Sequence, residues 1–115
     1  MILIELPWPP KTLSPNNRAC RYAKARDTKK YRRDCWVCAK AAGPSSEITS
    51  PLLVITFCPP DKRRRDLDNM LASAKAAIDS IADALGIDDQ HFALQLERGQ
   101  PVPNGAVLVR VTQKD

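Results

Sequence analysis

The sequence has no long apolar run, which argues against a membrane-spanning protein. No stretch approaches the roughly 20 apolar residues that a membrane-spanning helix needs. Residues 1–6 lack the charged start and the long apolar region of a signal peptide. We therefore expect a cytoplasmic protein whose cysteines stay reduced.

Histidine is also scarce, which weakens the case for a zinc protein. Cys35 and Cys38 have the spacing of half a zinc site or of a redox pair. A zinc site needs four ligands, and Cys20, Cys58 and the single His91 have no matching paired spacing. We interpret the pair as small apolar residues inside a helix. A metal or thiol function for the pair is the competing hypothesis.

Acidic residues are fewer than basic ones, 13 against 18, which gives a formal net charge of +5. Such a surface favours an anionic partner, either nucleic acid or an anionic membrane. Most of the cations fall in two segments, and Tyr22, Tyr31 and Trp36 lie among those of the first. The two groups are Arg18, Arg21, Lys24, Arg26, Lys29, Lys30, Arg32, Arg33 and Lys40, and then Lys62, Arg63, Arg64 and Arg65.

Apolar patterns predict four strands in a single domain spanning residues 1–115. Residues 2–6 alternate and end at Pro7, and residues 52–58 form a nearly continuous apolar run. Such a run is typical of a central strand covered on both faces. Residues 92–96 and 107–111 alternate as well, and we expect these two strands to form an antiparallel hairpin.

Two main helices are predicted between these strands. The first is capped by Asp27 and Thr28 and runs to about Ala42, where Gly43 and Pro44 stop it. Its inward face is predicted from four residues spaced three or four apart, which are Tyr31, Cys35, Cys38 and Ala42.

The second helix covers residues 69–85 with apolar residues three or four apart. Gly86 ends it in the left-handed conformation, and Ile87 packs back on the last turn. The expected fold is therefore an α/β (α+β) domain, with a mixed sheet of about four strands and two main helices.

The most informative stretch is residues 63–69, where three arginines precede two aspartates. If the chain from Asp66 to Asp68 is extended, both carboxylates point to the same side. Mg²⁺ is commonly held by one or two carboxylates together with water and phosphate oxygens, and the arginines would hold that phosphate. Alternatively, Asp66, Asp68 and Asn69 are helix N-terminal residues, which capping and the helix dipole favour.

A second acidic pair, Asp88 and Asp89, follows the second helix. A straight helix over residues 69–85 is about 26 Å long, so Asp68 and Asp89 cannot share one metal ion within one chain. Either the helix is bent, or two chains share the site in a homodimer whose helices run antiparallel. The alternative is an ordinary solvated turn at Asp88, Asp89 and Gln90.

Four segments strongly resemble the RusA-type Holliday-junction resolvases. They are Leu6-Pro7-Trp8-Pro9-Pro10, Ser14-Pro15-Asn16-Asn17-Arg18, Pro60-Asp61-Lys62-Arg63-Arg64-Arg65-Asp66-Leu67-Asp68-Asn69 and Gly86-Ile87-Asp88-Asp89-Gln90. The resemblance implies a small homodimeric endonuclease, common in phages and prophages. Such an enzyme binds four-way DNA junctions and cuts two strands with Mg²⁺ or Mn²⁺.

The resemblance also implies roles for single residues. The family's catalytic, metal-binding carboxylates fall on Asp66, Asp68 and Asp89, and Asp88 is a further candidate ligand. The family's lysine would fall on Ala72, whereas Lys75 lies three residues later, rotated by about 60° on a continuous helix. Lys75 either stabilises charge on the reacting phosphate or forms a surface pair with Asp79.

DNA contacts are expected from both basic segments and from the asparagines beside them. These residues are Asn16, Asn17, Arg18, Arg21, Lys24, Arg26, Lys29, Lys30, Lys62, Arg63, Arg64, Arg65 and Asn69. Trp8 and Tyr22 could stack on opened bases, whereas core packing is the expected role of Tyr31. The alternative function is a non-catalytic protein that binds branched DNA, in which the acids only cap a helix.

Overall fold

The chain folds into a four-stranded sheet and three α-helices, seen in a computed structural model that describes residues 1–43 and 48–114. In chain order the elements are β1 (Ile2–Pro7), the 3-10 helix η1 (Lys11–Leu13), α1 (Arg21–Ala41), β2 (Pro51–Cys58), α2 (Leu67–Ser73), α3 (Lys75–Leu85), the 3-10 helix η2 (Asp89–His91), β3 (Ala93–Arg98) and β4 (Ala106–Gln113). The predicted fold class is confirmed. No helix in the described ranges is both long and apolar enough to cross a membrane.

The sheet is mixed, with strand order β1-β4-β2-β3. β3 runs parallel to β2, and β4 lies antiparallel to both β1 and β2. The predicted hairpin of the last two strands is therefore wrong. The helical crossover from β2 returns the chain parallel to it, as such connections do, so β3 takes the edge. β4 enters the interior, where its three alternating valines are almost completely buried.

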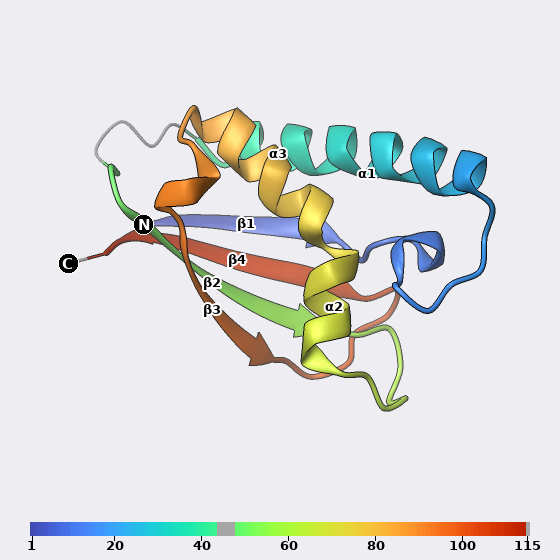
Figure 1. Ribbon diagram of the computed structural model, residues 1–115. Coiled ribbons are helices and arrows are strands. Elements are labelled where there is room, and N and C mark those ends of the chain that lie inside the picture. The colour runs from blue at the N-terminus through green and yellow to red at the C-terminus, as the bar shows by residue number, and fades with distance from the viewer. Residues whose placement is uncertain (44–47, 115) are drawn as a thin grey trace.

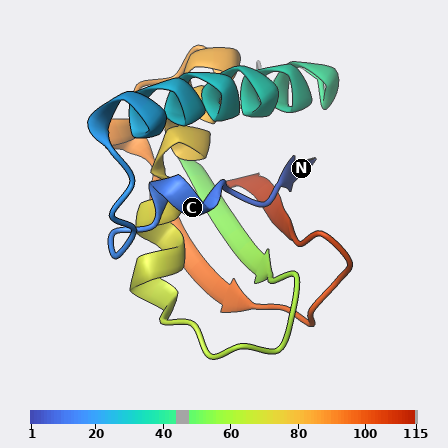
Figure 2. The same cartoon turned by 90° about the vertical axis from the view of Figure 1, so that its right-hand side faces the viewer.

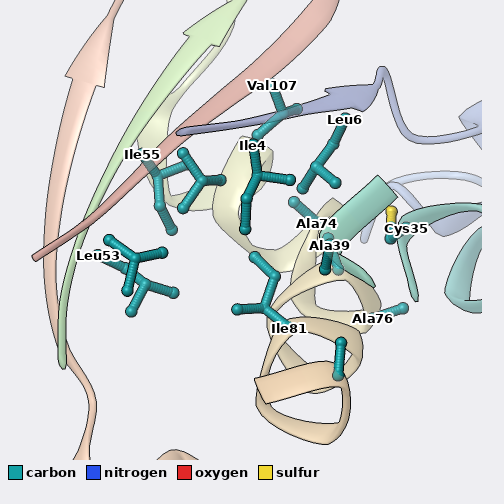
Figure 3. Packing of buried hydrophobic residues seen from close by; sticks show 14 of the residues in the cluster. Ile4, Leu6, Cys35, Ala39, Leu53, Ile55, Ala74, Ala76, Ile81 and Val107 are labelled. Atoms are coloured by element: carbon teal, nitrogen blue, oxygen red, sulfur yellow. The ribbon is translucent and has the colours of Figure 1, made fainter. Parts of the chain in front are cut away.

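All three helices lie on one side of the sheet (Figure 1). Leu53, Ile55 and Phe57 of β2 belong to the core cluster, in which helix and strand side chains pack together (Figure 3). Within the described ranges, the opposite side of the sheet carries no helix or second sheet. The prediction that β2 is covered on both faces is therefore wrong. Val54 on the open side is still only 7% exposed, because two paired strands flank it.

α1 is longer than predicted and starts at Arg21, after Cys20 at its N-cap. Asp27 lies inside the helix, where its Oδ2 accepts a 2.7 Å hydrogen bond from the Thr12 hydroxyl of η1. The bond from Thr12, followed by the nearby Arg26 guanidinium, lowers the pKa of Asp27. The predicted start was wrong because this acid joins two elements and does not cap one.

The buried stripe of α1 consists of Tyr31, Cys35 and Ala39, each one turn after the last. Tyr31 is confirmed as a core residue, and its hydroxyl donates a 2.7 Å hydrogen bond to the carbonyl oxygen of Pro7 in β1. Cys38 is only partly buried and Ala42 is exposed, so the predicted inward face was wrong at its C-terminal end, where Ala39 is buried instead. Pro44, the predicted stop, lies outside the described residues.

The predicted second helix is two helices that meet at Ala74, whose backbone has φ −98° and ψ 7°. The hydroxyl of Ser73 donates a 2.9 Å hydrogen bond to the carbonyl oxygen of Asn69, an arrangement that often bends helices. The end at Gly86 is confirmed, with φ 69° and a 3.1 Å bond from the Ile87 N–H to the Ala82 carbonyl. This is the Schellman pattern.

Candidate active-site cleft

A cleft of about 700 Å³ opens where the end of β1 meets the start of α2. Figure 2 shows the blue η1 beside the yellow-green α2 at this place. Three of the four segments that carry the resemblance contribute to the cleft, which explains how distant parts of the sequence act together. The lining consists of Trp8, Pro9, Pro10, Lys11, Ser14, Asn16, Asn17, Pro60, Asp61, Arg63, Arg64, Arg65, Asp66, Asn69, Met70 and Ser73.

Asp66 lines this cleft, and its carboxylate has no partner among the residues that the structure describes. It occupies the N-cap position of α2 with φ −81° and ψ 138°, but its side chain makes no capping hydrogen bond. Asp68 lies in the first turn of α2, is exposed and does not line the cleft. The helix starts at Leu67, so the expectation of an extended chain from Asp66 to Asp68 is wrong. The alternative interpretation correctly placed these residues at the N-terminal end of a helix, but the side chain of Asp66 does not cap that helix.

The acid that binds the arginines is Asp61, which was not among the residues predicted for the site. Its Oδ1 accepts a 2.8 Å bond from Arg65 Nη1 and a 2.9 Å bond from the backbone N–H of Arg63. The Arg65 bond, followed by the Arg63 N–H, lowers the pKa of Asp61 to about 2. Arg64 is exposed and has no hydrogen-bond or ion-pair partner within the described ranges.

A second, shallower cleft of about 430 Å³ lies near the end of α3. Asp88 caps η2 by accepting a 3.0 Å bond from the backbone N–H of Gln90. Asp89 is exposed and lines the second cleft, without a partner in the part of the chain that the structure describes. The turn interpretation therefore fits Asp88 but leaves Asp89 free. The lining residues are Arg32, Asp79, Ala82, Asp83, Gly86, Ile87 and Asp89.

The two clefts share no residue, because α2 contributes to the lining of the first and α3 to the lining of the second. Among residues 1–43 and 48–114 of one chain, no three His, Cys, Asp or Glu side chains lie close enough together to hold a metal ion. The bend at Ala74 is real, but it does not bring Asp66 and Asp89 into one cleft.

Lys75 stands at the start of α3, exposed and outside the lining of both clefts. It forms no ion pair with Asp79 within the described ranges, so the predicted surface pair is absent. The break at Ala74 also removes the continuous helix on which its offset from Ala72 was calculated.

The basic residues of α1 lie mostly on its solvent side. Arg26 pairs with Asp27 at 3.2 Å and Lys30 pairs with Asp34 at 3.0 Å, which leaves cations such as Lys29 exposed and unpaired among the described residues. Tyr22 is 89% exposed. This helix face can therefore contact a polyanion without rearrangement.

Comparisons with known proteins decide the family. The chain is 31% identical over 112 residues to the crossover junction endodeoxyribonuclease rusA of Enterobacteria phage HK97, an alignment that covers 94% of this chain and 91% of that protein. It is 33% identical over 112 residues to crossover junction endodeoxyribonuclease RusA of Escherichia coli K12, which covers 91% of this chain and 88% of the relative. The chain belongs to the RusA family.

A third relative of this RusA-family chain is an uncharacterized protein of Xylella fastidiosa. It is 44% identical over 94 residues, which is 77% of this chain but only 61% of the Xylella protein. No protein-family model matches the chain.

Proposed function

We propose that this RusA-family protein is a metal-dependent endodeoxyribonuclease that cuts four-way DNA junctions as a homodimer. The observation that carries the proposal is the cleft, in which the free carboxylate of Asp66 lies beside exposed cations such as Arg64. The HK97 and E. coli relatives are named crossover junction endodeoxyribonucleases, which supports the cleavage of DNA junctions.

The side chains suit a hard divalent ion. Among the described residues, the carboxylates of Asp66 and Asp68 form no ion pair and accept no hydrogen bond from an N–H group. Asp89 provides a third carboxylate without a partner among these residues. Carboxylates with water and phosphate oxygens are the ligands that Mg²⁺ and Mn²⁺ prefer. We assign the metal to Asp66 and Asp68 of one chain and to Asp89 of the other. When bound, the ion would polarise a phosphate oxygen and lower the pKa of a water molecule.

The cations of the chain would bind the phosphate and stabilise negative charge. The guanidinium of Arg64 is free to bind a phosphate and to stabilise the charge that develops during hydrolysis. Lys62 and Arg63 are exposed on the same loop and extend this positive surface. Lys75 would contribute only if the DNA or the second chain comes near the start of α3.

The separation of the two clefts supports a homodimer. If two chains pair with their α2–α3 segments antiparallel, each Asp89 approaches the Asp66 and Asp68 of the other chain, which gives two equivalent sites. A four-way junction has approximate two-fold symmetry, so paired sites can cut symmetrically placed strands. The exposed cations of α1 would bind backbone phosphates of the junction arms, which gives affinity without sequence readout.

The test uses a synthetic four-way junction and a plain duplex of equal length, each with and without Mg²⁺. We expect the wild type to cut only the junction and only with the metal. Asp66→Asn and Asp68→Asn should bind the junction but not cut it, whereas Glu5→Gln, an exposed acid on β1, should cut normally. Metal-independent binding without any cleavage by the wild type would favour the non-catalytic, branched-DNA-binding alternative.

A further inference from the structure

Arg65 differs from the two arginines before it because its side chain is held on several sides. Its side chain is only 22% exposed, against 78% for Arg63. Nη1 donates a 2.8 Å bond to Asp61 Oδ1 and longer bonds of 3.4 Å to the carbonyl oxygens of Asp61 and Arg63. The guanidinium carbon lies 5.7 Å from the centre of the Trp8 ring, within the range of a cation–π contact.

Trp8 is itself a fixed platform. Its ring meets Phe57 of β2 edge-on, with ring centres 6.4 Å apart. Gly105 approaches so closely that a Cβ there would lie 2.9 Å from Trp8 Cβ and Cγ and 3.1 Å from Pro60 Cδ. The ring therefore has little freedom to move, and a guanidinium that rests on it is anchored to the sheet.

The backbone next to Asp66 is anchored from another strand. Arg98 at the end of β3 donates a 2.7 Å bond from Nη1 to the carbonyl oxygen of Arg65, the residue directly before Asp66. Asp66 makes no capping bond of its own. Its carbonyl oxygen accepts a 3.1 Å helical bond from the Met70 N–H, and on the other side its backbone is held through the contacts of Arg65.

We infer that Arg65 is a positioning residue, which with Asp61, Trp8 and Arg98 fixes the loop that presents Asp66, and that it does not bind phosphate. The inference rests on the proposed function, because positioning matters only if Asp66 serves in the reaction. Nη1 of Arg65 is already used by Asp61 and by two carbonyl oxygens, and its guanidinium rests on Trp8, so Arg65 has less freedom to reach DNA than an exposed arginine. Arg64, one residue earlier, is exposed and carries neither contact.

The neighbouring arginines give a matched pair of variants. Arg65→Ala should lower the cleavage rate at saturating junction by about tenfold or more, because small misplacement of a reacting group is costly. Its junction affinity without metal should change less than about twofold, whereas Arg64→Ala should weaken that affinity. Asp61→Asn should reproduce the Arg65→Ala defect, and the double variant should be no worse than either single one. Arg65→Lys should restore part of the rate, since it keeps the charge but lacks the planar fork.

Two further readouts do not depend on cleavage. In a Trp36→Phe background the fluorescence reports Trp8 alone, and its emission should shift in Arg65→Ala and Asp61→Asn but not in Arg64→Ala. Calorimetric titration with Mn²⁺ should show weaker binding for Arg65→Ala than for Arg64→Ala. Thermal melts identify any variant that fails to fold.

The outcomes separate the two proposals. If the wild type does not cut the junction, the proposed function fails, and the fluorescence and Mn²⁺ titrations still judge the role of Arg65. If the wild type cuts, and Arg65→Ala loses junction affinity as much as Arg64→Ala while Asp61→Asn cuts normally, the inference is overturned. Unchanged Trp8 emission in Arg65→Ala would overturn it as well.

Discussion

Asp88 accepts a 3.0 Å hydrogen bond from the backbone N–H of Gln90, whereas its neighbour Asp89 has no partner among the described residues. Because an amide oxygen can accept the same bond, we expect Asp88→Asn to keep both the turn and most of the cleavage rate. Asp89→Asn should lower that rate about 100-fold or more, since loss of even an outer-shell partner of a metal costs 10–100-fold. Single-turnover junction cleavage measures both. Equal losses in the two variants would contradict this division of roles.

Gly86 ends α3 with φ 69°, a conformation in which an L side chain is strained. The space around it is open, with nothing within 4 Å of an added Cβ, so the cost of a substitution is conformational. We expect Gly86→Ala to lower the free energy of unfolding by about 1 kcal/mol in urea denaturation. Gly86→Asn should lose less, since asparagine tolerates the left-handed region better. An alanine variant as stable as the wild type would show that the strain is absent.

The thiols should differ sharply in reactivity. All four cysteines are free, with Cys20 exposed and Cys35 buried. Burial raises the pKa of Cys35 from 9.0 to about 12. Its thiol thus stays protonated in the folded protein at pH 8, and its contribution to stability should be lost progressively as the pH rises above 9.0. We expect iodoacetamide at pH 8 to modify Cys20 first and Cys35 only on unfolding.

The cysteine pair also tests the competing hypothesis about function. The variant with Cys35→Ser and Cys38→Ser should cut junctions at the normal rate, with some loss of stability because Cys35 is completely buried. Loss of cleavage in a variant that remains folded would support a thiol or metal role for the pair.

Junction binding should depend steeply on salt, because exposed cations release counterions from DNA. For each phosphate contact removed, the slope of log affinity against log salt should fall by about 0.9. We expect such a reduction for Lys29→Ala on α1 and for Arg64→Ala at the cleft. Lys114→Ala, an exposed residue near the C-terminus that lines neither cleft, serves as the control. If the salt slopes of Lys29→Ala and Arg64→Ala equal that of Lys114→Ala, these two residues do not contact DNA phosphates.

Much of the fold could be predicted because local patterns determine it. Alternation predicted β1, β3 and β4, a nearly continuous apolar run predicted β2, and Gly86 with Ile87 predicted the end of α3. Strand order was not predictable in this way, since the pairing of β4 with β1 and β2 depends on contacts distant in sequence. A bent helix was one of the two alternatives, but its position at Ala74 was not predicted, because the apolar spacing of residues 71–85 continues across the bend that Ser73 favours.

The candidate site was predictable in composition more than in geometry. The sequence pointed to Asp66, Asp68 and Asp89, and the fold leaves all three without partners among the described residues. It gave no sign that Asp61 would bind Arg65, because Asp61 resembles any loop acid until the chain folds over Trp8. Arg98 was missed for the same reason, since its contact comes from the parallel pairing of β3 with β2.

The separation of Asp66 and Asp89 into two clefts makes assembly of the site from two chains the central claim. Subunits carrying only Asp68→Asn are mixed after unfolding with subunits carrying only Asp89→Asn, and junction cleavage with Mg²⁺ is followed. Each homodimer alone should be inactive. Random pairing makes about half of the dimers heterodimers, and each heterodimer has one intact site out of two. About a quarter of all sites are then intact, so at equal protein concentration the mixture should nick junctions at about a quarter of the wild-type rate. A mixture as inactive as the separate homodimers would contradict the shared site.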